Sequence, residues 1–175
     1  MQFSKGQVVV HPQHGPATVE QVTSRVVQGV TRRYVSLAVH ADGMTVALPV
    51  EVAEEVGVRP VMDPAHVREV LGVLVAESEP FDKVWSRRQK NNTERLRSGD
   101  LPQIAALVRD LTRRNDEKPI SYGEGNLLRE GLELLAAELA IVLGVSEDRA
   151  VELVESAVRD RAVPEPLAGE LLLAS

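Results

Sequence analysis

Apolar and polar residues alternate along the first 60 residues with the period of two that is typical of β-strands. Runs rich in β-branched residues are separated by Pro, Gly and Asp-Gly turn signals. Five short strands are expected here, at residues 7–11, 17–22, 25–30, 33–39 and 44–49. Because closing a small sheet removes exposed strand edges, we expect a small, twisted, partly closed β-barrel. The stretch Met44–Leu48 is expected to stay open as an edge, where a segment of a partner protein could pair with it.

From residue 61 onward apolar residues recur three and four positions apart, as on one face of an α-helix. Asp63-Pro64 is a typical helix start, with a capping residue before a proline in the first turn. Further helix starts are expected at Asp82, after the Ser98-Gly99-Asp100 break, at the capping box formed by Ser121 and Glu124, and at Ser146. The sequence therefore predicts an α+β protein with a β module at 1–60, an all-helical domain of about five helices at 61–160 and a flexible tail at 161–175.

The only tryptophan lies inside the strongest basic cluster of the chain. From Lys83 to Arg97 there are six cations and one acid, Glu94, although the whole chain has a formal net charge of -6. Cations can hold the phosphates of DNA while an aromatic ring inserts at a base step. The alternative is that Trp85 is a partly buried helix residue whose charged neighbours only solvate the helix. These residues by themselves leave both interpretations open.

The overall charge limits how such a cluster could work. With 43% hydrophobic and 26% charged residues the composition is that of an ordinary globular protein. A net charge of -6 repels nucleic acid at long range, so binding through one basic patch would be weak and sensitive to salt. A role on DNA therefore needs a second anchor, and we expect the rest of the chain to offer a surface for a protein partner.

Several kinds of site find no support in the sequence. The absence of cysteine excludes disulfides, thiolate metal sites and a cysteine nucleophile, and suits a reducing cytoplasm. No signal peptide and no run of roughly 20 apolar residues is present, so we expect a cytoplasmic protein without a membrane span. His11 and His14 have no third ligand candidate nearby, and no metal or cofactor is expected. No nucleophile or phosphate-loop motif is found, so we expect no enzymatic activity.

A set of short motifs extends over about residues 1–160. In order, these are Gly6–Val10 with Pro12-Gln13-His14-Gly15, Leu48-Pro49, Val56-Gly57-Val58-Arg59, Trp85-Ser86-Arg87-Arg88 with Lys90, Ser98-Gly99-Asp100 and Val108-Arg109-Asp110-Leu111. With its order and spacing, the set resembles the CarD family of bacterial transcription regulators, and most of all its actinobacterial members.

The resemblance implies a Tudor-like N-terminal module that binds the β subunit of RNA polymerase, followed by a helical domain that meets promoter DNA. In the family, the tryptophan that matches Trp85 wedges into the minor groove at the upstream edge of the opened bubble. The other DNA-binding residues expected in this stretch are Lys83, Arg87, Arg88, Lys90 and Asn91. The expected polymerase-binding residues are Arg25, Val27, Thr45, Val46 and Ala47. Ala47 stands where mycobacterial members carry an arginine.

Two functions of different classes are compatible with these features. The first is a non-enzymatic regulator that binds polymerase and promoter DNA together, as a monomer, and stabilises the open complex. The second is a protein-only adaptor that bridges two partners without touching DNA, in which Trp85 serves packing. Salt-dependent binding to a forked promoter fragment would separate them, because only the first releases counterions from DNA.

Overall fold

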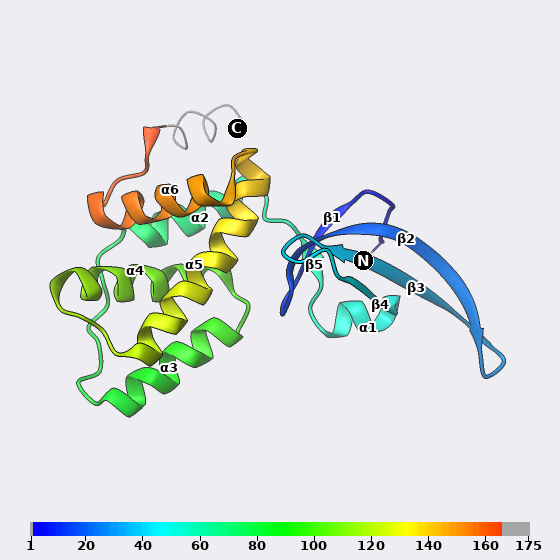
Figure 1. Ribbon diagram of the computed structural model, residues 1–175, viewed down its shortest axis with the longest axis horizontal. Helices are drawn as coiled ribbons and strands as arrows, with labels where there is room; N and C mark the ends of the chain where they lie inside the picture. Colours follow the sequence, from blue (N-terminus) through cyan, green and yellow to red (C-terminus); the bar gives the residue numbers. More distant parts are fainter. Residues whose placement is uncertain (1, 166–175) are drawn as a thin grey trace. The chain divides into compact units, whose positions relative to one another are not determined.

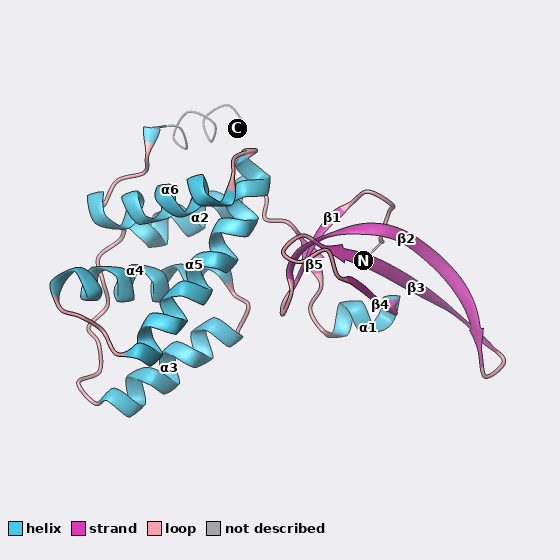
Figure 2. Cartoon of the chain, in the orientation of Figure 1, coloured by secondary structure: helices cyan, strands magenta, loops and turns pink. Residues whose placement is uncertain are grey.

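The computed structural model describes residues 2–165. The chain divides into two compact units, and the boundary along the sequence lies between Val61 and Met62. All strands lie in the first unit, and all helices except the short α1 lie in the second (Figures 1 and 2). The predicted α+β fold class is confirmed. Each unit has its own apolar core.

The first unit is built on one antiparallel sheet of five strands. These are β1 (Val8–His11), β2 (Gly15–Val27), β3 (Val30–Val39), β4 (Thr45–Pro49) and β5 (Arg59–Pro60). Their order is β4-β3-β2-β1-β5, so β4 is an edge strand, as the sequence predicted. The helix α1 (Val50–Glu55) follows β4 directly and buries Val50 and Ala53 in the core. Neither α1 nor β5 was among the predicted elements, since both are too short to show a period.

The prediction of separate strands at 17–22 and 25–30 is wrong. The 13 residues of β2 run without interruption to Val27, and the chain reverses at Gln28 and Gly29. Both turn residues have positive φ, 52° and 78°, which matches the right-handed twist of a two-residue hairpin. A register shift between Val19 and Gln21 changes which side chains face the core, so the alternation in the sequence is broken within one strand.

Between residues 62 and 165 the structure describes five helices longer than one turn. They are α2 (Pro64–Val75), α3 (Trp85–Arg97), α4 (Leu101–Glu117), α5 (Tyr122–Leu143) and α6 (Glu147–Asp160). The predicted caps at Asp63, Ser121 and Ser146 are confirmed, since each side chain accepts a hydrogen bond from a backbone N–H three residues later. Fully buried leucines and valines from α2, α4, α5 and α6 form the core.

The predicted cap of α3 is wrong by two residues. Val84 precedes the helix, and the carboxylate of Asp82 instead accepts a hydrogen bond from the backbone N of Val84 at 2.8 Å. Asp82 therefore stabilises the turn that leads into the helix, as aspartates do in loops. Of the predicted tail, residues 166–175 lie outside the described part of the chain.

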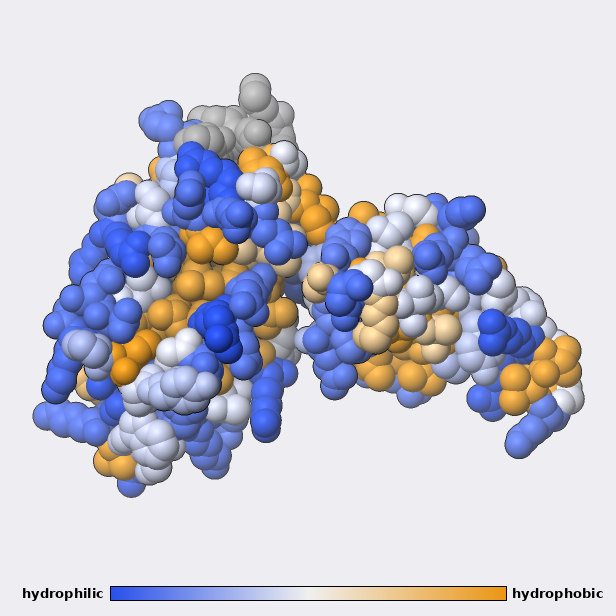
Figure 3. Space-filling view, viewed as in Figure 1, coloured by the Kyte–Doolittle hydropathy of each residue, from blue (hydrophilic) through white to orange (hydrophobic). Residues whose placement is uncertain are grey.

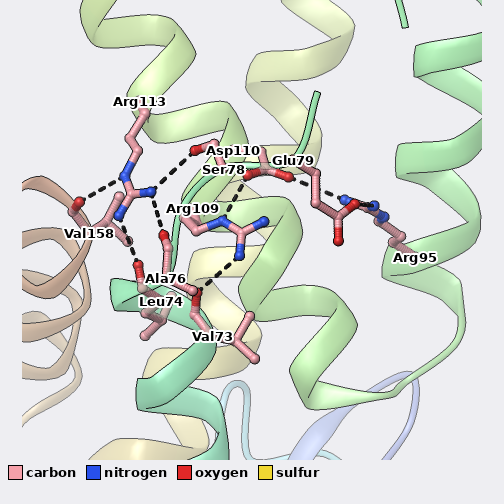
Figure 4. Close-up of polar contacts among 10 residues, drawn as sticks. All are labelled: Val73, Leu74, Ala76, Ser78, Glu79, Arg95, Arg109, Asp110, Arg113 and Val158. Atoms are coloured by element: carbon pink, nitrogen blue, oxygen red, sulfur yellow. Dashed lines mark hydrogen bonds and ion pairs between the residues drawn. The ribbon is translucent and has the colours of Figure 1, made fainter. Parts of the chain in front are cut away.

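The arginines of α4 hold the ends of neighbouring helices. The guanidinium of Arg113 donates to the carbonyl oxygens of Leu74 at 3.2 Å, Ala76 at 2.6 Å and Val158 at 3.0 Å (Figure 4). Burial, together with the charges of Arg161 and Arg109, lowers the pKa of Arg113 below its usual value. This side chain thus donates to carbonyl groups at the ends of α2 and α6 that lack a backbone N–H partner within their own helix.

Replacing Arg113 by methionine is expected to destabilise the protein by about 1 to 3 kcal/mol, because partly buried carbonyl groups lose their donor. Chemical denaturation of the full chain measures this loss. The exposed Arg97 provides a control, and Arg97→Met should stay within about 0.5 kcal/mol of the parent protein. Equal effects of the two substitutions would contradict the structural role of Arg113.

Candidate nucleic-acid interface

Trp85 is the first residue of α3, and 53% of its surface is exposed. Its indole N–H donates to the hydroxyl of Ser121, which caps α5, at 3.3 Å. The ring is therefore anchored at its polar edge without being enclosed in the apolar core. Phe81, Val84 and Tyr122 are also exposed, by 58%, 47% and 86%. Apolar surface thus gathers on the residues that precede and begin α3 and α5.

Exposed polar and cationic residues accompany Trp85 on α3 and the turn before it. Lys83, Arg87, Lys90 and Asn91 are all exposed, as the predicted phosphate-binding role requires. The guanidinium of Arg87 lies 3.9 Å from Asp82, and the ammonium of Lys90 lies 3.8 Å from Glu94. Ion pairs this long and this exposed are worth little, so both cations can turn to a phosphate at small cost.

Arg88 departs from the expectation that it binds phosphate. Only 11% of its side chain is exposed, and its Nε donates to the carboxylate of Glu124 on α5 at 2.8 Å. Its Nη1 donates to the backbone carbonyls of Asp82 at 2.9 Å and Lys83 at 3.4 Å. The reason is helical spacing: Arg88 lies one turn after Trp85, on the face of α3 that packs against α5. Arg88 therefore has a structural position, and we correct its assignment.

Glu124 is almost completely buried and acts as the charged partner of Arg88. Burial alone would raise the pKa of Glu124, but hydrogen bonds from the side chain of Arg88 and from the backbone and hydroxyl of Ser121 outweigh it. The pKa of Glu124 thus lies below its usual value of 4.5. At neutral pH the pair is ionised, and the start of α3 is joined to the start of α5 by a buried salt bridge.

The predicted polymerase-binding residues are distributed over the β4 edge and the β2–β3 hairpin. Thr45 and Ala47 are exposed on β4, whereas Val46 points inward and packs against the core. The side chain of Val46 therefore faces the core, because alternate residues of a strand face opposite sides, and its expected contact with a partner stays a prediction for its backbone groups. Arg25 lies on β2, with its guanidinium 5.4 Å from the ring centre of Tyr34.

The tip of the β2–β3 hairpin carries an exposed apolar patch, of which only Val27 had been expected to contact a partner. Val26, Val27 and Val30 are 72%, 39% and 55% exposed, and they form the hydrophobic end of the hairpin in Figure 3. Three arginines lie close by in the strands: Arg25, Arg32 and Arg33. Within residues 2–165 none of the three forms an ion pair. The signal available in the sequence was the pair of β-branched runs on either side of Gln28-Gly29.

Other kinds of site find no support among the residues described. Within residues 2–165 no group of three or more His, Asp or Glu side chains could hold a metal ion. The rings of His11 and His14 are 4.6 Å apart, and burial together with the neighbouring imidazole lowers the pKa of His11. In the same range no helix is both long and apolar enough to cross a membrane.

Comparisons with known proteins identify the family. Residues 3–62 match the family model "CarD-like/TRCF RID domain", a kind of domain that interacts with RNA polymerase, and residues 69–155 match "CarD, C-terminal domain". The chain is 26% identical over 145 residues to the Bacillus subtilis (strain 168) protein named "Putative transcription factor YdeB". That alignment covers 83% of this chain and 95% of the relative. The resemblance is confirmed: the chain belongs to the CarD family, whose members are of the transcription-factor type and not a known class of enzyme.

Proposed function

We propose that this protein binds the β subunit of RNA polymerase and promoter DNA together, and so stabilises the open complex. The observation that carries the proposal is the position of Trp85. A half-exposed tryptophan starts a helix beside exposed cations, in a protein whose net charge is -6. Such a ring is costly to expose and has no packing role in the described core, but it suits insertion between bases.

On the DNA side, the exposed cations and the ring have separate tasks. Lys83, Arg87 and Lys90 bind phosphates and hold the start of α3 against the backbone of the duplex. Trp85 then occupies the gap at a base step where the two strands separate. Stacking on an aromatic ring stabilises the separated bases, which slows closing of the bubble.

On the polymerase side, the β4 edge offers backbone groups that pair with no other strand of the described chain. A strand of the partner can add to this edge, with backbone hydrogen bonds giving affinity. Arg25 and Val27, on the hairpin beside it, extend the contact. Because Ala47 supplies no charge, the contact depends more strongly on Arg25.

The two contacts work together. A protein tethered to polymerase has a high effective concentration at the promoter, so even weak intrinsic affinity for DNA is sufficient. This explains how an acidic protein with one basic cluster can act on DNA. If the protein adds no salt-dependent affinity for a forked promoter fragment, the protein-only adaptor is favoured instead.

Replacing Lys90 by alanine is expected to lower the slope of log affinity against log salt by about one unit for a forked promoter fragment bound with polymerase, because one phosphate contact is lost. Arg129→Ala is a matched control: both residues form exposed ion pairs with a glutamate four positions later, at 3.8 Å and 3.9 Å. The control should leave the slope unchanged. A changed sequence preference at constant slope would contradict the phosphate role.

Reversing the charge at Arg25 is expected to weaken binding to the polymerase β subunit by about tenfold or more, because an anion then faces the partner where a cation was favourable. Titration of the full chain against isolated β subunit measures the effect. Lys5→Glu makes the same charge change at another exposed position of the first unit and should bind as the parent protein does. If Arg25→Glu binds with unchanged affinity, the interface lies elsewhere.

A further inference from the structure

We propose that Ser121 is a positioning residue for Trp85: its hydroxyl holds the indole in the orientation in which the ring enters the DNA. This inference rests on the proposed function, because it concerns the same ring. It assigns a new role to a residue whose evident task is to cap α5.

The hydroxyl of Ser121 takes part in three hydrogen bonds. It accepts from the indole Nε1 of Trp85 at 3.3 Å and from the backbone N of Glu124 at 3.3 Å. It donates to Oε2 of Glu124 at 2.9 Å. A hydroxyl has one proton and two lone pairs, so its capacity is filled by these three partners. The rotation of the hydroxyl is thereby fixed, and the lone pair that receives the indole has a set direction.

The other end of the Trp85 residue is held by the same turn of α5. Oε1 of Glu124 accepts from Arg88, and Arg88 in turn donates to the backbone carbonyls of Asp82 and Lys83. The backbone that leads to Trp85 and the polar edge of its ring are thus both attached to α5. A tryptophan side chain has only two rotatable bonds, so these attachments restrict it strongly.

The consequence for binding is twofold. A ring that is already oriented loses less conformational freedom when it enters the DNA, which raises affinity without a new contact. In addition, an indole N–H that enters a base stack loses water, and leaving it without a partner would be unfavourable. Ser121 provides that partner from within the protein. Loss of the hydroxyl is therefore expected to shorten the lifetime of the open complex by about three- to tenfold.

Ser121→Ala also removes a helix cap, and this effect has to be separated from positioning. Ser146 caps α6 through the same kind of bond, accepting from the backbone N of Arg149 at 3.2 Å, but without the capping box that Ser121 forms with Glu124. Ser146→Ala therefore loses a comparable cap on a different helix. Ser121→Thr keeps a hydroxyl at the cap and should restore the parent behaviour. The Trp85→Phe background keeps an aromatic ring but removes the N–H that Ser121 accepts from.

The test combines open-complex decay, with full-length protein and polymerase, and fluorescence of the sole tryptophan in the free protein. We expect Ser121→Ala to lower the fluorescence anisotropy of Trp85 and to speed decay of the open complex by about three- to tenfold. Ser146→Ala should change neither quantity. In the Trp85→Phe background, Ser121→Ala should have no further effect on decay. An equal effect in both backgrounds would mean that Ser121 only caps the helix, and would overturn the inference.

The same measurements distinguish this inference from the proposed function. If Trp85→Ala speeds decay while Ser121→Ala does not, the function stands and the positioning role is refuted. If Trp85→Ala leaves decay unchanged, the proposed function fails, and a role of Ser121 in DNA binding fails with it. Unchanged anisotropy in Ser121→Ala would by itself refute the claim that the hydroxyl orients the ring.

Discussion

Replacing Glu124 by glutamine is expected to destabilise the protein by about 3 to 5 kcal/mol, because the buried guanidinium of Arg88 then loses the carboxylate with which it is paired. Glutamine keeps the size of the side chain and can still form a capping box with Ser121, so the change isolates the charge. Denaturant unfolding at pH 7 measures the loss. On the same helix, Glu133→Gln breaks an exposed pair with Arg129 at 3.9 Å and should cost at most about 1 kcal/mol.

The loss of stability caused by Glu124→Gln should become smaller as the pH falls. Since the pKa of Glu124 is lower in the folded protein than its usual 4.5, the unfolded chain takes up a proton first as the pH falls. The stability from this carboxylate is therefore fully present above pH 4.5 and is lost as the pH falls through the lower, folded value. The parent protein and Glu124→Gln should thus approach each other in stability in acid. If the difference in stability between the two proteins is the same at neutral and at acidic pH, the buried ion pair is contradicted.

The helix ends could be predicted from the sequence because a cap needs only residues that are close in the chain. Asp63, Ser121 and Ser146 each meet a backbone N–H three positions later, and Gly144 ends α5 with a φ of 64°. Such short-range geometry does not depend on the rest of the fold. Asp82 does not cap α3 as predicted, because an aspartate in this position can also accept a hydrogen bond within the turn that precedes the helix.

The different roles of the cations could not be predicted, since they depend on contacts between distant residues. Arg87, Arg88 and Lys90 are equivalent by composition, but only Arg88 meets an acid 36 positions away in the chain. Helical spacing shows that these residues point in different directions, but not which direction faces another helix. The hydrogen bond between Trp85 and Ser121, also 36 positions apart, was hidden for the same reason.

The burial of Arg88 changes what the basic cluster can do. With Arg88 paired to Glu124 at 2.8 Å and Arg95 paired to Glu79 at 2.6 Å, two of the six cations are held in close ion pairs with acids of the protein itself. The remaining cations are exposed, and they lie on the turn before α3 and along its outer side. The cluster is therefore smaller than the sequence suggests, which makes its affinity for DNA depend even more on tethering to a partner.

Trp85→Ala is expected to shorten the lifetime of the open complex by about tenfold to a hundredfold, since stacking by one aromatic ring is worth roughly 1 to 3 kcal/mol per base. The substitution should leave binding to isolated polymerase β subunit unchanged, because Trp85 belongs to the second unit and the proposed contact to the first. Folding should also change little, because 53% of the residue is exposed and the described core does not include it.

Decay of the open complex and thermal unfolding, measured on the same Trp85→Ala protein, decide between insertion and packing. A tryptophan packed in the core would cost about 3 to 5 kcal/mol on truncation, and the melting temperature would fall accordingly. Tyr122→Ala is the matched control, since it removes an aromatic side chain that is 86% exposed at the start of the neighbouring helix α5. It should have a smaller effect on decay than Trp85→Ala, because among residues 2–165 no hydrogen bond or ring contact directs its side chain. A large loss of melting temperature with unchanged decay would refute insertion of Trp85 into the DNA.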